Sequence, residues 1–177
     1  MNKRMVFSER ETCNQDGCYI DPSLPADILI QLMLIHLDEQ DLQLINRLSP
    51  LMKDDIFYIV EEYVNQLAIS DSKSLQHINE FKNFLRSHIY ELFSGRIDTD
   101  FINSRKKLAL YHQKFGLELA GYFKCIAELF KYIFEKGNII KLNDTNPSHL
   151  PRAITRIISF ELMLVHLYME KHSSLVS

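Results

Sequence analysis

Arg105 and His112 are the two residues of this sequence whose types and spacing carry the most distinctive chemistry. They belong to a set spaced i, i+4, i+7, i+11 and i+14, which places all its members on one side of a helix: Phe101, Arg105, Leu108, His112 and Phe115. A lone arginine on an apolar stripe is costly unless an anion pairs with it. The stripe therefore predicts one of three arrangements for Arg105: a side chain that reaches outward to solvent, an ion pair with a nearby acid such as Asp98, or a cation that meets the carboxylate of an apolar ligand. His112 is either a core residue with a satisfied ring or a metal ligand.

No catalytic motif accompanies this stripe. The sequence contains no GxSxG, HExxH, Walker loop, GxGxxG or kinase motif, and its seven histidines show no metal-ligand spacing. Cys13 and Cys18 flank a polar tetrapeptide, but a zinc site would need two further ligands nearby. The sequence therefore predicts a protein that is not an enzyme and has no cysteine or histidine cluster for a metal.

The elements that must position these residues are helices. Glycine and proline number only five each among 177 residues and lie mainly between apolar stretches, which favours long helices over a turn-rich β fold. Asp38, Asp98 and the dipeptide Ser49-Pro50 mark helix starts. Apolar periodicity then predicts almost no β structure and a series of helices at about 23–37, 38–48, 49–67, 75–92, 98–115, 117–135 and 152–171.

One domain accounts for this pattern, because domains most often hold about 100–150 residues. Residues 1–22 are polar and aperiodic and predict a flexible N-terminal arm, residues 23–172 form the domain, and residues 173–177 are a tail. The net charge of −3 predicts no binding to nucleic acid. The longest apolar run, residues 28–37, is too short to span a membrane, and no export signal is visible. We therefore expect a cytoplasmic protein with reduced cysteines.

The last two predicted helices are apolar on more than one face. The final helix carries two apolar stripes: Ile154, Ile158, Leu162, Val165 and Met169 on one, and Ile157, Phe160, Leu164 and Leu167 on the other. The helix before it also carries many apolar residues: Phe123, Ile126, Ala127, Phe130, Ile133 and Phe134. A helix that is apolar most of the way round is buried on two sides. In a domain of this size the second side predicts a partner subunit, so we expect a homodimer.

The span from Leu85 to Phe123 carries several motifs at consistent spacing. In one-letter code they are HIYELFSGRID, then DFI, then Arg105, an apolar pair before His112, and FGL with a following aromatic. A weaker match, LDEQDLQLINRLSPLMKDDI, extends the pattern upstream, so that it covers about residues 32–170. These motifs resemble those of the globin-coupled sensor (protoglobin) family, typified by the heme-based aerotaxis transducer. The resemblance implies an all-α, globin-like fold with an extra N-terminal helix and a dimer formed through the last two helices.

The resemblance places His112 at the position of the family's proximal heme ligand. One expectation is therefore a heme b sensor of oxygen or another gas, with His112 bound to the iron. Three departures speak against heme. The family's distal tyrosine falls on Val64, although Tyr63 is adjacent, its distal threonine falls on the bulky Phe84, and the segment before His88 is shorter than in the oxygen sensor. An oxygen complex without a distal donor loses a hydrogen bond, worth roughly 1–3 kcal/mol if left unsatisfied.

Where the sequence departs from the heme-binding members, it resembles a smaller branch of the same superfamily. This branch consists of heme-free sensor globins related to the input domain of a sporulation sensor kinase. In that branch an apolar pocket holds a fatty acid whose carboxylate meets an arginine, with chloride nearby. Stand-alone members are proposed to sequester the signal from the kinase and so to inhibit sporulation. The family's output module has no counterpart in this sequence. Our first expectation is therefore a stand-alone, heme-free fatty-acid sensor in a sensor-kinase pathway, and a role in protein interaction alone is a third alternative.

On the first expectation Arg105 meets the fatty-acid carboxylate and His112 lies near the head group. Other arginines are rivals for the carboxylate: Arg86, Arg152 and Arg156. The residues expected to line the apolar tunnel are Val64, Phe81, Phe84, Leu108 and Phe115.

Overall fold

The computed structural model describes residues 17–70, 75–115, 119–137 and 149–173. The elements in these ranges are β1 (Tyr19–Ile20), α1 (Ala26–Leu34), α2 (Glu39–Asn46), α3 (Ser49–Ser70), α4 (Leu75–Glu91), β2 (Arg96–Ile97), α5 (Thr99–Phe115), α6 (Leu119–Gly137) and α7 (His149–Ser173). The all-α prediction is confirmed, and every predicted helix is present within a few residues of its expected bounds. None of the described helices combines the length and the apolar character needed to cross a membrane.

The predicted caps explain where two of the helices begin. Asp38 and Asp41 form a reciprocal capping box at α2: the backbone N–H of Asp41 donates to Asp38 Oδ1 at 3.0 Å, and that of Asp38 donates to Asp41 Oδ2 at 3.4 Å. Asp98 caps α5 by accepting from the N–H of Phe101 at 2.9 Å. The cap at Asp98 thus sets the start of the helix that carries the Arg105 stripe.

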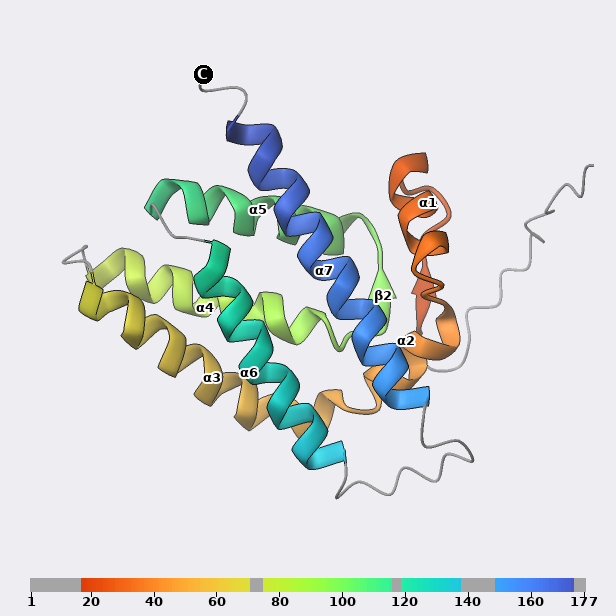
Figure 1. Ribbon diagram of the computed structural model, residues 1–177, viewed down its shortest axis with the longest axis horizontal. Coiled ribbons are helices and arrows are strands. Elements are labelled where there is room, and N and C mark those ends of the chain that lie inside the picture. The colour runs from red at the N-terminus through yellow and green to blue at the C-terminus, as the bar shows by residue number, and fades with distance from the viewer. Residues whose placement is uncertain (1–16, 71–74, 116–118, 138–148, 174–177) are drawn as a thin grey trace, which may run out of the picture.

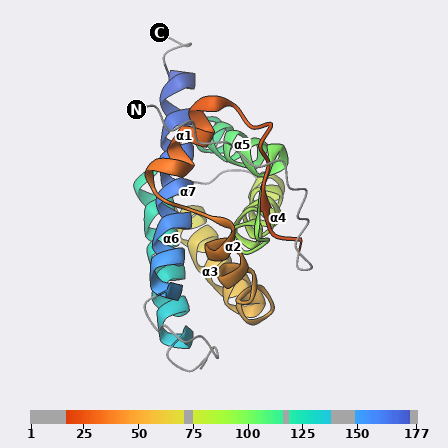
Figure 2. The ribbon, with the colours of Figure 1, turned by 90° about the vertical axis from the view of Figure 1, so that its right-hand side faces the viewer.

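α5 packs on α7 and on α4. α7 crosses α5 and also packs on α2, while α3 packs on both α4 and α6 (Figure 1). Figure 2 shows α6 and α7 along one side of the molecule and α3, α4 and α5 along the other. Every described helix contributes buried side chains to one core. The stripe of α5 therefore lies between α4 and α7, at the centre of the molecule.

Residues 17–22, which the sequence assigns to a flexible arm, are held against the domain. β1 pairs in parallel with β2, and Cys18 just before β1 is only 1% exposed. Gly95 has a φ of 75°, and a Cβ at that position would lie 2.4 Å from the Cys18 sulfur, so a larger residue would clash. Cys18 is therefore a buried thiol and not part of a polar tail. Cys13 lies outside the described residues.

Most apolar side chains on the two faces of α7 are buried within this one chain, while Leu162, Leu167 and Met169 are partly buried. Ile158 on one face is 3% exposed, and Leu164 on the other is 0% exposed. Since α7 packs on α2, α5 and α6 at once, its second apolar face does not require a partner subunit. α6 differs, because Phe123 and Phe134 are each 40% exposed. Of the two helices expected to form a dimer, α6 is the one with apolar surface available to a second copy.

Candidate functional site

Arg105 lies at the centre of the molecule with no exposed surface. Its Nε–H donates to Oε2 of Glu161 on α7 at 2.5 Å, and its Nη1–H donates to Oε2 of Glu91 on α4 at 2.7 Å. Nη1 also donates to the backbone carbonyl of Phe101 at 3.1 Å, and the guanidinium carbon stands 3.3 Å from the centroid of the Phe101 ring. An ion pair of the predicted kind is therefore present, but its acids are Glu161 and Glu91 and not Asp98.

Glu161 is the hub of a buried polar network. Its side chain is fully buried and also accepts hydrogen bonds from Nε2 of His88 at 2.8 Å and from the hydroxyl of Tyr122 at 2.7 Å. Burial by itself would raise the pKa of Glu161, but the charge of Arg105 and the bonds from His88 and Tyr122 outweigh it and lower this pKa to about 2. Glu161 is therefore ionised at neutral pH, and helices α4 to α7 meet at its carboxylate.

His88 is neutral in this network. Burial lowers its pKa more than the charge of Glu161 raises it. We assign the ring proton to Nε2, which donates to Glu161, so that Nδ1 accepts from the hydroxyl of Ser104 at 2.8 Å. Ser104, His88 and Glu161 are linked by two hydrogen bonds of 2.8 Å, as serine, histidine and acid are in a hydrolase triad. However, Ser104 lies inside α5, whose backbone N–H groups are engaged in the helix and provide no oxyanion hole. The geometry therefore favours a role in stability over one in catalysis.

His112 shares the stripe with Arg105 but not its bonding. Its side chain has no exposed surface, and its Nδ1–H donates to the carbonyl oxygen of Leu108, one turn earlier, at 3.0 Å. Burial lowers the pKa of His112, so the ring is neutral at neutral pH. The rings of Phe81 and Tyr122 stand edge-on to it, with centroids 6.2 and 5.5 Å away. Nε2 is buried and has no hydrogen-bond partner among the described residues.

A bare, buried imidazole nitrogen fits a metal ligand better than a core residue. Histidines that bind metals are neutral, and a hydrogen bond from the second ring nitrogen fixes their tautomer. Both conditions hold at His112. The described part of the chain contains no group of three or more side chains that could hold a metal ion together. The arrangement at His112 therefore suits a metal that brings its other ligands with it, as heme iron does.

Phe81 and Leu108 are the predicted tunnel residues that the structure brings to His112. Phe81 supplies an edge-on ring, and Leu108 supplies the carbonyl that holds Nδ1. Phe84 is partly buried, and its ring packs on that of Tyr111 with centroids 4.9 Å apart. The ring of Tyr111 also lies 5.7 Å from that of Phe81. The surroundings of His112 are therefore largely aromatic.

Val64 belongs to the same buried core as Phe81 and Leu108. Val64 is buried on α3. Phe115 is the last residue of α5, and its side chain lies outside what the structure describes. Tyr63, next to Val64, has its hydroxyl beside Gly121 of α6, where a Cβ would lie 3.3 Å from it.

The rival arginines have other surroundings. Arg86 forms an ion pair with Glu61. Arg156 pairs with the buried Asp41 at 2.7 Å and so ties α7 to α2. Arg152 is exposed on α7. Among the arginines considered for the carboxylate, Arg105 is the one with no exposed surface.

The partners of Arg105 were missed by reasoning from sequence alone. Glu161 interrupts the apolar run at residues 157–165, just as Arg105 interrupts the apolar stripe of α5. Each charge is costly when buried alone. Two buried charges of opposite sign on different helices therefore indicate an ion pair between those helices. This interruption of two apolar patterns is the signal in the sequence that points to Glu161 as a partner of Arg105.

A comparison against known families agrees with the all-helical fold. A family model described as Protoglobin matches residues 24–174, a span that includes every described helix. The match covers most of the chain, and the chain therefore belongs to the protoglobin family.

Proposed function

We propose that this chain is a globin sensor domain in which His112 binds the iron of a heme through Nε2. The observation that carries the proposal is the buried Nε2, which has no hydrogen-bond partner in the described ranges while Nδ1 is held by Leu108. A buried polar atom without a partner costs roughly 1–3 kcal/mol. A bond to iron would remove that cost. The proposal thus prefers the heme alternative to the heme-free sensor that the sequence favours.

The chain's own residues would have three tasks at this site. The Leu108 carbonyl fixes the tautomer of His112 and makes Nε2 a better electron donor. The rings of Phe81 and Tyr122 keep water away from the imidazole. Burial keeps His112 unprotonated, so its lone pair stays available at neutral pH. The heme, when bound, supplies an iron that can take a diatomic gas.

A fatty acid on Arg105 is the second candidate. One observation favours it: Nη2 of Arg105 is buried and has no hydrogen-bond partner among the residues described. The charges weigh against it, because Arg105 brings one positive charge while Glu161 and Glu91 bring two negative ones. A further carboxylate, or a chloride, would enter a site that is already negative. The link to a sporulation sensor kinase stays a prediction that depends on this candidate.

The visible spectrum of the freshly purified chain, with mass spectrometry of a solvent extract, separates the two candidates. The heme proposal predicts a Soret band and no stoichiometric fatty acid. A colourless protein whose extract holds one fatty acid per chain would replace the first candidate with the second. If the purified protein carries neither heme nor a fatty acid, it is titrated with hemin and with a long-chain fatty acid. Saturable 1:1 binding of hemin supports the first candidate, and saturable 1:1 binding of the fatty acid supports the second.

We also propose that two copies associate through α6. Apolar side chains recur along it at i, i+4, i+7 and i+11: Phe123, Ala127, Phe130 and Phe134. The rings of Phe130 and Phe134 stack with centroids 5.9 Å apart. Phe123 and Phe134 are each 40% exposed and offer apolar surface to a second copy. Phe134→Glu should shift light scattering from dimer toward monomer, whereas Leu34→Glu, at an exposed position on α1, should not. A parent chain that is monomeric at micromolar concentration would contradict the proposal.

A further inference from the structure

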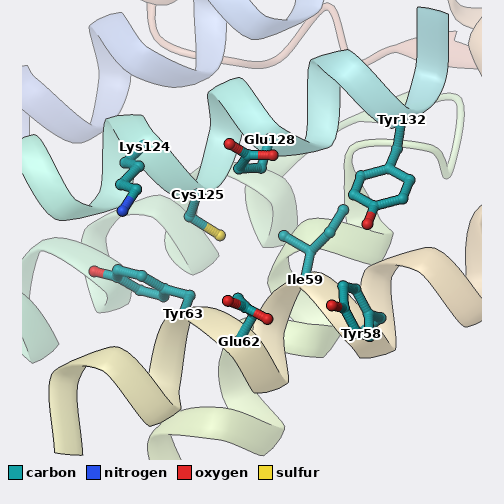
Figure 3. Close-up of a pocket in the computed structure, with 8 residues that line it drawn as sticks. All are labelled: Tyr58, Ile59, Glu62, Tyr63, Lys124, Cys125, Glu128 and Tyr132. Atoms are coloured by element: carbon teal, nitrogen blue, oxygen red, sulfur yellow. The ribbon is translucent and has the colours of Figure 1, made fainter. Parts of the chain in front are cut away.

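α3 and α6 enclose a groove outside the buried network, with a volume of about 260 Å³. Ile59 and Glu62 from α3 form one wall, and Cys125 and Glu128 from α6 form the other (Figure 3). Ligand clefts in proteins commonly measure about 300–1,000 Å³, so this groove suits a small ligand. It plays no part in the proposed binding of heme.

The lining of the groove carries more negative than positive charge. Glu62 and Glu128 stand on opposite walls, and Lys124 supplies one ammonium group (Figure 3). The buried groups beside them are uncharged, because burial raises the pKa of the Cys125 thiol to about 12 and also raises the pKa of the Tyr63 phenol. The lining thus presents two carboxylates and one ammonium group. Such a lining attracts a cation and repels a fatty acid.

One end of the groove is aromatic. Tyr58 and Tyr132 meet there edge to face, with ring centroids 6.3 Å apart and an angle of 66° between the rings (Figure 3). Aromatic rings hold another ring in such arrangements, and their faces attract cations. The charge of Glu62 raises the pKa of Tyr58, so a carboxylate lies close to this aromatic end.

The other end of the groove contains a polar atom without a partner. Tyr63 is only 6% exposed, and its hydroxyl is buried with no hydrogen-bond partner in the described part of the chain. Gly121 lies beside that hydroxyl on α6, and its lack of a side chain keeps the space next to the oxygen open. Buried polar atoms in proteins nearly always have a partner. The hydroxyl therefore indicates that a polar group of a ligand belongs in this groove.

We propose that the α3–α6 groove binds a small primary arylalkylamine, with its ammonium group between Glu62 and Glu128 and its ring against Tyr58 and Tyr132. A primary ammonium has three N–H donors, and the two carboxylates on opposite walls supply acceptors for it (Figure 3). The described residues hold no group of three or more metal-ligating side chains, which argues against a bare metal ion here.

Titration of the isotope-labelled full-length chain with 2-phenylethylamine, followed by NMR chemical shifts, tests this proposal. We expect saturable binding with shifts confined to α3 and α6. The alcohol 2-phenylethanol has nearly the same shape but no charge, and it should bind at least about tenfold more weakly because it forms no charge-assisted hydrogen bonds.

Three variants sharpen the titration. Glu128→Gln should weaken amine binding about tenfold because it removes a charge-assisted acceptor. Lys124→Met removes the competing ammonium group, so it should strengthen binding severalfold. Glu170→Gln makes the same change of charge at an exposed position of α7 and should leave the affinity unchanged. Glu128 and Lys124 are both exposed, so we expect these variants to fold, and circular dichroism checks this before the titration.

Several outcomes would overturn the proposal. These are no saturable binding up to about 10 mM amine, equal affinity for the alcohol, shifts centred outside α3 and α6, or an equal effect of Glu170→Gln and Glu128→Gln. The groove is independent of His112, so His112→Ala should leave amine binding unchanged. Failure of the heme proposal and failure of this one are therefore distinguishable.

Discussion

Arg105 and His112 lie on one stripe of α5, two helical turns apart, and neither exposes any surface. Their hydrogen bonding differs. The Arg105 guanidinium donates to two carboxylates and a carbonyl through Nε and Nη1 and leaves Nη2 bare, whereas His112 uses one ring nitrogen, to a carbonyl of its own helix, and leaves Nε2 bare. Three hydrogen bonds, two of them to carboxylates on other helices, tie Arg105 into the polar network of the fold. His112 has no bond to another helix among the described residues, and it is the residue that we propose as the ligand of the iron. The type of a buried residue does not tell these roles apart, but its partners on other helices do.

Among the variants of Arg105, Glu161 and His112, Arg105→Met should lower the free energy of unfolding the most. Methionine keeps much of the volume but leaves Glu161 and Glu91 without their cation. Removing one partner of a buried ion pair costs about 3–5 kcal/mol, so we expect the free energy of unfolding in urea to fall by about that amount. Arg152→Met, at an exposed position of α7, is the control and should stay within about 0.5 kcal/mol of the parent.

This result would assign Arg105 to the fold, whereas the sequence predicts a cation that meets the carboxylate of a fatty acid. An Arg105→Met chain as stable as the parent would contradict the structural role of Arg105. It would return this residue to the role of a cation held ready for a ligand.

Acidification should remove much of the stabilisation that the ion pair between Glu161 and Arg105 provides. The pKa of Glu161 is about 2 in the folded chain, against an ordinary value of 4.5, so the unfolded chain takes up this proton first as the pH falls. The contribution of Glu161 is complete above about pH 4.5, is lost as the pH falls toward about 2, and amounts to about 3 kcal/mol.

Urea unfolding of the parent and of Glu161→Gln across this range measures the effect. The variant should be less stable at neutral pH, and it should lose less stability than the parent on acidification because its side chain does not titrate. Equal acid sensitivity of the two chains would contradict the central place of Glu161 in the network.

Replacing His112 with leucine in the heme-free chain should have the smallest effect on stability. The change loses one hydrogen bond to Leu108, worth about 1 kcal/mol, but it also removes the bare Nε2, whose burial costs roughly 1–3 kcal/mol. We therefore expect the free energy of unfolding to stay within about 1 kcal/mol of the parent's. A loss as large as that of Arg105→Met would place His112 among the structural residues.

The helices could be predicted from sequence because the signals that encode them are local. Asp38 and Asp98 cap the helices that follow them, and apolar periodicity marks each buried face. The same periodicity correctly places Arg105 and His112 on a buried stripe, since both are fully buried.

The partners across helices could not be predicted in the same way. Glu161 is 56 residues from Arg105 in the chain, and the choice among Glu161, Glu91 and Asp98 depends on how α5 and α7 cross. The dimer expected from the apolar faces of α6 and α7 stays a prediction. How much of the second apolar face of α7 is covered by α2, α5 and α6 depends on tertiary packing, which a helical pattern does not contain.

Titration of the heme-free chain with hemin at neutral pH tests the central claim most directly. The proposal predicts a saturable 1:1 Soret band for the parent, its loss in His112→Gly, and its return when free imidazole is added to that variant. His166→Ala, at an exposed histidine of α7, should bind hemin like the parent. A parent chain without a stoichiometric band, or a His112→Gly variant with an unchanged band, would contradict the assignment of His112 as the iron ligand.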